Sequence, residues 1–155
     1  SSSLSIWKLT RKGLMETKTK RVKLEWVRSR MFVGTDHLGN STAIGYLRDD
    51  DQEGQGINPS DMLLLAAASC SAYDVVQILE KAQQPLEDLR VDVSAEQSQE
   101  PPYPYVSLHF SYQVKGNVDA EKLERAMQLS EEKYCSVLAT VKPALTFTSD
   151  YQIDS

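Results

Sequence analysis

The sequence predicts an α+β fold whose elements follow in the order β-β-β-α-β-β-α-β. Alternating apolar and polar residues mark the strands, apolar steps of three and four mark the helices, and strands are grouped apart from helices. With 155 residues, 25% of them charged, the chain fits a soluble globular protein. We expect a flexible N-terminal extension over residues 1–18 and a single domain over residues 19–155.

The N-terminal part of the chain predicts an antiparallel hairpin or meander. Residues 22–27 alternate as in a half-buried strand, residues 31–33 continue in an extended form, and residues 42–47 predict a third short strand. Residues 34–40 contain the Gly and Asn that a turn needs.

A long helix is predicted over residues 58–83, with Pro59 tolerated in its first turn and Pro85 stopping it. Its middle is apolar or small on all sides, whereas a surface helix keeps a polar face. The sheet and the second helix of one chain are too few to cover such a helix on every side, so we expect an obligate homodimer. The longest apolar run, residues 62–68, is shorter than a membrane span, so we expect no membrane contact.

The C-terminal part predicts two half-buried strands, a second helix and a closing strand. The strands are expected over residues 89–95, 106–114 and 145–153, and the helix over residues 119–134 with a short extra turn over residues 136–141. We therefore expect antiparallel pairs of strands, with the helices grouped apart from them.

Charge and cysteine spacing exclude several classes of function. The net charge is −5, and because the basic groups gather in residues 1–23, the remaining acidic body would repel nucleic acid. Cys70 and Cys135 form no C-x-x-C pair, so their spacing gives no signature of a zinc site. No export signal is recognisable, so we expect the reducing cytoplasm, where structural disulfides are rare.

The two cysteines lie in distinctive segments, NPSDMLLLAAASCSAYDVV at residues 58–76 and RAMQLSEEKYCSV at residues 125–137. These segments resemble the two cysteine motifs of the OsmC/Ohr family, the osmotically inducible protein C-like and organic hydroperoxide resistance proteins. The resemblance spans about residues 20–154. It implies an OsmC-like domain that forms an intertwined homodimer, in which antiparallel sheets surround long central helices.

The resemblance also implies a thiol-dependent peroxidase that reduces organic hydroperoxides in oxidative stress defence. Cys70 matches the position that attacks the peroxide and becomes a sulfenic acid. Cys135 matches the resolving position, which condenses with that acid to a disulfide and so protects the sulfur from irreversible oxidation. A dithiol reductant, lipoyl-type in some members, would restore both thiols. The chemistry that the resemblance implies needs no metal and no organic cofactor.

The sequence departs from the family at the groups that activate the first cysteine. Active members use an arginine from the N-terminal sheet, held by a glutamate ten residues before that cysteine, but Ser60 stands at this position here. We expect Arg48 to supply the guanidinium, ahead of Arg28 and Arg30. The departure indicates a divergent OsmC-like branch.

Two other interpretations remain open. One is a non-catalytic OsmC-like dimer that binds a small lipophilic ligand, with both cysteines structural, and the other is a structural or stress-associated dimer without a ligand. His37 and His109 are expected to be solvated residues rather than catalytic bases. Asp74, one helical turn after Cys70, is expected to cap or pair structurally.

Overall fold

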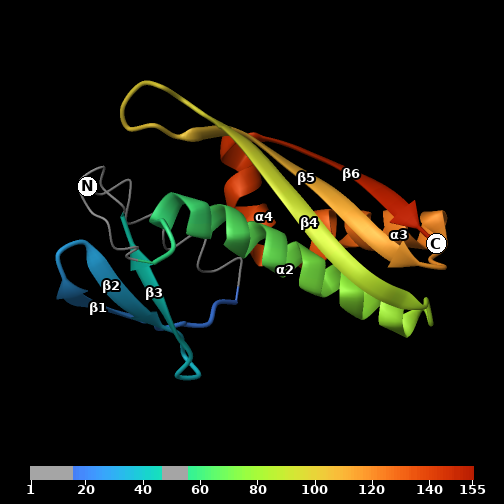
Figure 1. Cartoon of the computed structure of the whole chain (residues 1–155), viewed down its shortest axis with the longest axis horizontal. Coiled ribbons are helices and arrows are strands. Elements are labelled where there is room, and N and C mark those ends of the chain that lie inside the picture. Colours follow the sequence, from blue (N-terminus) through green and yellow to red (C-terminus); the bar gives the residue numbers. More distant parts are fainter. Residues whose placement is uncertain (1–15, 47–55) are drawn as a thin grey trace. The chain divides into compact units, whose positions relative to one another are not determined.

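A computed structural model describes residues 16–46 and 56–155, which fall into two compact units divided after Pro59. The first unit contains a three-stranded sheet, drawn in blue and cyan in Figure 1. Its strands are β1 (Lys23–Arg28), β2 (Met31–Thr35) and β3 (Ser41–Gly45), and β2 pairs antiparallel with both neighbours. The predicted antiparallel meander is confirmed.

Strand β1 leaves large apolar side chains uncovered within its unit. Leu24 and Trp26 lie opposite Gly34 and Phe32 of β2, yet they are 61% and 67% exposed. A row of exposed apolar side chains of this size is typical of a surface that another chain covers.

The second unit begins with the long helix α2 (Pro59–Lys81), close to the predicted range. Pro59 starts the helix and Asp61 lies in its first turn, where the helix dipole favours a carboxylate. Beyond the last turn, Gln83 adopts a left-handed backbone conformation with φ of 57°, just before Pro85. The buried residues of α2 recur at short steps along one face: Ala67, Ala68, Ser71, Val75 and Leu79.

The opposite face of α2 is exposed in a single chain, where Leu65 is 51% and Tyr73 is 66% exposed. By length and apolar composition alone, α2 is the one helix of the described residues that could span a membrane. A helix in the core of a protein has the same composition. Here Val75 and Leu79 are fully buried in the core of the second unit.

The second sheet consists of β4 (Leu86–Gln97), β5 (Tyr105–Gly116) and β6 (Thr146–Asp154), with β5 in the centre. β4 and β5 are antiparallel, but β5 and β6 are parallel. The antiparallel pairing that we predicted is therefore wrong for β6. Because the chain crosses back over the sheet between residues 117 and 145, β6 starts at the same end as β5.

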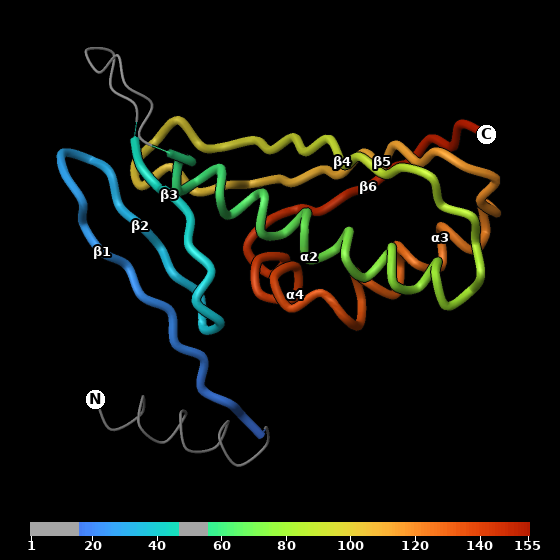
Figure 2. The backbone as a smooth tube through the Cα atoms, turned by 60° about the horizontal axis from the view of Figure 1, so that its bottom comes forward, coloured from blue at the N-terminus to red at the C-terminus, as the bar shows by residue number. Residues whose placement is uncertain are grey.

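This crossover consists of α3 (Ala120–Leu129), the π-helical turn η1 (Ser130–Tyr134), α4 (Ser136–Val141) and the 3-10 turn η2 (Lys142–Ala144). The predicted second helix begins as expected, since the Asp119 side chain caps α3 by accepting the Glu121 N–H at 2.8 Å. Its last turn is wound as a π-helix, and Cys135 interrupts the helix with an extended backbone (φ −79°, ψ 103°). Figure 2 shows α2, α3 and α4 on one side of the second sheet.

The core of the second unit lies between these helices and the sheet. Alternate residues of β5 point into it and are at most 2% exposed: Leu108, Phe110, Tyr112 and Val114. From the helices, Leu123 and Leu138 are fully buried. The mixed α+β class and the order of elements are therefore as the sequence predicted.

Candidate functional site

The two cysteines lie on different elements of the second unit. Cys70 is half-buried in the middle of α2, whereas Cys135 is 2% exposed at the break between η1 and α4. The Cys135 sulfur caps α4, accepting the Leu138 N–H at 3.4 Å. It also lies 4.0 Å from the carbonyl oxygen of Ala67, which precedes Cys70 by three residues. The fold thus places the second cysteine against the helical turn that carries the first.

The pKa of Cys135 reflects its burial and the groups around its sulfur. Burial raises the pKa of the Cys135 thiol from 9.0 to about 11, and the hydrogen bond from Leu138 lowers it in part. A hydrogen bond and charge repulsion from Cys70 raise the same pKa further. Cys135 is therefore a neutral thiol at neutral pH.

A buried polar cluster joins the cysteine-bearing segments. The Ser130 hydroxyl donates to the Asp74 carboxylate at 2.9 Å and lies 3.0 Å from the Ser71 hydroxyl oxygen. Ser71 is in turn 2.6 Å from the Tyr112 hydroxyl of β5. Burial raises the pKa of Tyr112 to about 12, so its hydroxyl stays neutral, and either hydroxyl of this pair can act as the donor.

The sequence interpretation found only part of this cluster. Asp74 pairs structurally, as expected, but its partner Ser130 and the links through Ser71 and Tyr112 were missed. A signal was present, because Ser130 lies on the buried face of the second helix and Ser71 on that of the first. A hydroxyl at a core position needs a hydrogen-bond partner.

The arginines expected to activate Cys70 are Arg48, Arg28 and Arg30. Arg48 lies outside the described residues. Arg28 ends β1 and Arg30 lies between β1 and β2, so both belong to the first unit. Ser60 lies in the first turn of α2.

Both histidines are at least partly exposed. His109 lies on the outer face of the second sheet, where its Nδ1 is 2.6 Å from the Thr148 hydroxyl and its Nε2 is 3.2 Å from Asp150. Hydrogen bonds from Ser111 and His109 lower the pKa of the Asp150 carboxyl. His37 is exposed in the turn after β2. Within residues 16–46 and 56–155, no cluster of three or more His, Cys, Asp or Glu side chains could hold a metal ion.

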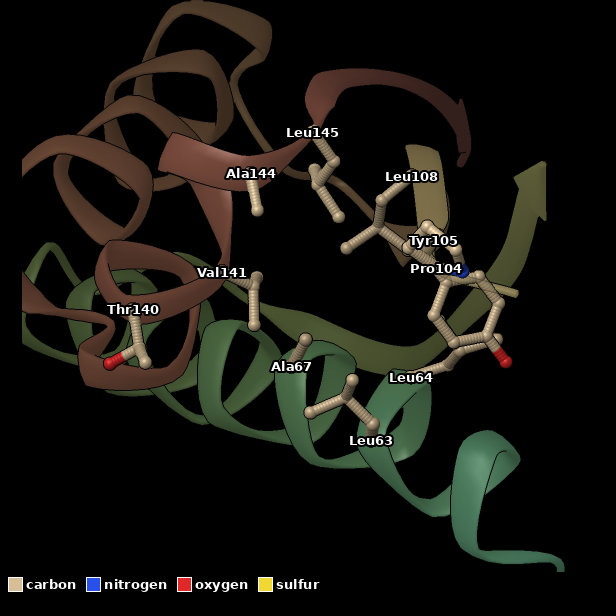
Figure 3. Close-up of a pocket in the computed structure, with 10 residues that line it drawn as sticks. All are labelled: Leu63, Leu64, Ala67, Pro104, Tyr105, Leu108, Thr140, Val141, Ala144 and Leu145. Atoms are coloured by element: carbon tan, nitrogen blue, oxygen red, sulfur yellow. The ribbon is translucent and has the colours of Figure 1, made fainter. Parts of the chain in front are cut away.

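An apolar pocket of about 260 Å³ lies beside the Cys135 segment. Figure 3 shows side chains converging on it from the start of α2, the β4–β5 loop, β5, α4 and η2. Its lining is Leu63, Leu64, Ala67, Pro104, Tyr105, Leu108, Thr140, Val141, Ala144 and Leu145. Ala67 belongs both to this lining and to the turn whose carbonyl faces the Cys135 sulfur. An alkyl or aryl group of modest size fits such a pocket.

Chemically, this arrangement offers a pair of thiols and an apolar cavity close to one of them. A thiol that is oxidised to a sulfenic acid condenses with a neighbouring thiol and releases water. Two cysteines can form a disulfide when their Cα atoms lie about 4.4–6.8 Å apart. A pair of thiols that meets this condition stores two reducing equivalents as it cycles between dithiol and disulfide.

Comparison with known proteins agrees with this fold. Residues 51–150 match the family model described as OsmC-like protein. Protein YhfA of Escherichia coli (strain K12) is 33% identical over 135 residues, which cover 86% of this chain and 97% of YhfA. A hypothetical protein from Aquifex aeolicus VF5, solved by crystallography, is 31% identical with a TM-score of 0.79, covering 89% of this chain and 98% of that one.

A more distant structure has a name that refers to peroxides. The organic hydroperoxide resistance protein from Elizabethkingia anophelis is 11% identical with a TM-score of 0.66, covering 90% of this chain and 100% of that chain. At this identity the likeness concerns the fold alone.

Proposed function

Because the chain belongs to the OsmC-like family, we propose that it is a thiol-dependent peroxidase that reduces organic hydroperoxides through Cys70 and Cys135. The observation that carries the proposal is that the Cys135 sulfur lies 4.0 Å from the carbonyl oxygen of Ala67, in the helical turn of α2 that leads to Cys70. The peroxide-related name of a distant structural relative is consistent with it.

The reaction proceeds in three balanced steps. The Cys70 thiolate attacks the outer peroxide oxygen and the O–O bond breaks, so that Cys70 becomes a sulfenic acid and the alkoxide takes up a proton and leaves as the alcohol. The Cys135 thiol then attacks the Cys70 sulfur, and water leaves as the disulfide forms. An external dithiol reduces this disulfide by thiol exchange and is itself oxidised to a disulfide.

The two thiols suit different steps. Cys70 is the more accessible of the pair, so it is the sulfur that a substrate can reach. Cys135 is buried and neutral because its pKa is raised to about 11, which keeps it from competing for peroxide. We propose that Arg48 supplies the cation that stabilises the Cys70 thiolate. We also propose that the reaction takes place in the cytoplasm, where reduced thiols persist.

The active form in this proposal is a homodimer of an OsmC-like domain over residues 19–155. The exposed apolar side chains of α2, Leu65 and Tyr73, and those of β1, Leu24 and Trp26, are the surfaces that a second copy would cover. A chain that sediments as a monomer at micromolar concentration would contradict this part of the proposal.

The test is turnover with both substrates supplied. Reduced protein, cumene hydroperoxide and dihydrolipoamide should give continuous peroxide loss, with one disulfide per chain when the dithiol is omitted. Cys70→Ser should abolish the loss, and Cys135→Ser should remove the disulfide. Arg48→Ala should slow the first step at least about tenfold, since a nearby cation sets the thiolate fraction. Arg28→Ala is the comparison variant. Thiols that survive excess peroxide would contradict the proposal.

The apolar pocket favours a second candidate, a non-catalytic protein that binds a small lipophilic ligand. Ala144 lines the pocket from η2, so Ala144→Phe should fill it. In a peroxidase this change raises KM for cumene hydroperoxide more than for the smaller t-butyl hydroperoxide. In a binding protein without redox chemistry it weakens binding of a dansyl-labelled fatty acid while wild-type thiols stay reduced in excess peroxide.

A further inference from the structure

We propose that Ser130 is a positioning residue that, held by Asp74 and Ser71 of α2, keeps the Cys135 thiol beside Cys70 and so sets how readily their disulfide forms. The inference rests on the proposed function only in that it concerns the same two sulfurs. The three residues are called the serine–aspartate cluster below.

Ser130 is connected to Cys135 through its backbone. It is the first residue of the π-helical turn η1, and its carbonyl oxygen accepts the Cys135 N–H at 2.8 Å. This bond spans five residues and closes the turn that ends at Cys135. A single π-helical turn within an α-helix is often found at a functional site, and here it determines where the second cysteine leaves the helix.

Ser130 is connected to Cys70 through its side chain. The hydroxyl donates to Asp74 at 2.9 Å, four residues after Cys70, and lies 3.0 Å from the hydroxyl of Ser71, the residue next to Cys70. Ser130 therefore contacts the α2 segment at one helical turn and at one residue from the first thiol. Ser130 thus forms hydrogen bonds with both cysteine-bearing segments, through its carbonyl oxygen to Cys135 and through its hydroxyl to α2.

Burial makes this connection costly to break. Ser130 is fully buried and Ser71 is 2% exposed, so a hydroxyl that loses its partner has no water to replace it. The bond to Asp74 has a carboxylate acceptor and belongs to the stronger, charge-assisted class. The sulfur of Cys135 has weaker contacts of its own, at 3.4 Å from the Leu138 nitrogen and 4.0 Å from the Ala67 oxygen.

Disulfide geometry explains why this positioning matters. A disulfide requires a Cα–Cα distance between about 4.4 and 6.8 Å, which leaves a tolerance of only about 2 Å. A small displacement of η1 away from α2 therefore lowers the effective concentration of one thiol at the other. The serine–aspartate cluster opposes that drift. It acts through Cys135 rather than on substrate.

The experiment measures the disulfide equilibrium without any peroxide. Reduced protein is equilibrated with glutathione buffers of known composition, quenched by alkylation, and the Cys70–Cys135 disulfide is quantified by intact mass. Ser130→Ala should lower the equilibrium constant for disulfide formation about tenfold, equivalent to about 30 mV in reduction potential. Asp74→Asn keeps an acceptor oxygen and should lie nearer to wild type than Asp74→Ala.

Ser69→Ala is the matched control, because Ser69 flanks Cys70 on the exposed side and its hydroxyl bonds only to the Ala66 carbonyl of its own helix among the contacts described. It should leave the equilibrium constant within twofold of wild type. A merely structural role would lower the unfolding temperature of the reduced and oxidised Ser130→Ala protein equally and leave the potential unchanged. An unchanged potential in Ser130→Ala, or an equal shift in Ser69→Ala, overturns the inference.

Failure of the inference and failure of the proposed function are distinguishable. Wild-type protein that forms the disulfide in glutathione but does not turn over hydroperoxide contradicts only the peroxidase activity. Wild-type protein that turns over hydroperoxide while the Ser130→Ala potential is unchanged contradicts only the positioning role. If Ser130→Ala does not fold, the Asp74→Ala and Asp74→Asn pair decides, and equal potentials for both and for wild type contradict the proposal.

Discussion

Alkaline pH should destabilise the folded protein through the buried Cys135 thiol. Its pKa is raised from 9.0 to about 11, chiefly because burial disfavours the thiolate. A group whose pKa is higher in the folded than in the unfolded chain stabilises the fold while it is protonated in both. This stabilisation is complete below about pH 9 and is lost as the pH rises towards 11.

The magnitude follows from the size of the shift. Two pKa units correspond to about 3 kcal/mol in the free energy of unfolding, of which about 2 kcal/mol should be lost between about pH 8 and about pH 10.5. Tyr112 adds to the loss at the upper end of this range, because burial raises its pKa to about 12. A variant without the thiol separates the two contributions.

The assay is urea unfolding of wild type and Cys135→Ala at a fixed protein concentration with a phosphine reductant. Cys135→Ala is less stable near pH 8 because it loses buried contacts, but it lacks the titrating group. The difference in unfolding free energy between the two proteins should therefore shrink by about 2 kcal/mol by about pH 10.5. A difference that stays constant over this range would refute the assignment of Cys135 as a buried neutral thiol.

Three further changes test the packing around the site. Leu138→Ala truncates a fully buried residue of α4 and should cost about 2–5 kcal/mol of stability, measured by chemical denaturation; a cost below about 1 kcal/mol would contradict its place in the core. Gly116→Ala should destabilise far more than Gly39→Ala in thermal unfolding. Both have positive φ, but only at Gly116 would a Cβ meet backbone, 2.3 Å from the Pro85 oxygen. Asp119→Ala removes the cap of α3 and should cost about 0.5–2 kcal/mol in the same assay, whereas no change would show that the cap contributes nothing.

Local signals in the sequence are strong enough to predict most elements of this fold. The proline and capping residues around α2 predict its start, and the period-two alternation in β4 and β5 predicts both strands and their antiparallel pairing. The direction of β6 cannot be predicted from such local signals. It depends on where a crossover of helices returns the chain, which no residue of β6 encodes locally.

The candidate site also combines features that local sequence predicts with features that only the folded chain shows. Each cysteine segment can be recognised from its own residues, but the contact between them cannot, because 64 residues separate Cys70 from Cys135. The π-helical turn at Ser130 is also beyond a helical-periodicity argument, since the same residues fit an unbroken α-helix. Only the packed structure shows that this turn brings a serine and a cysteine against one segment of α2.

The proposed roles of Cys70 as the sulfur that attacks peroxide and of Cys135 as the sulfur that resolves it are tested most directly by trapping the first oxidation product. Cys135→Ser is treated with one equivalent of cumene hydroperoxide in the presence of dimedone, and the modified residue is identified by peptide mass spectrometry. We expect the dimedone adduct on Cys70 in this variant, and its absence in wild type, where the Cys70–Cys135 disulfide forms instead. No adduct on Cys70, or an equal adduct in wild type without a disulfide, would contradict a redox pair at this site.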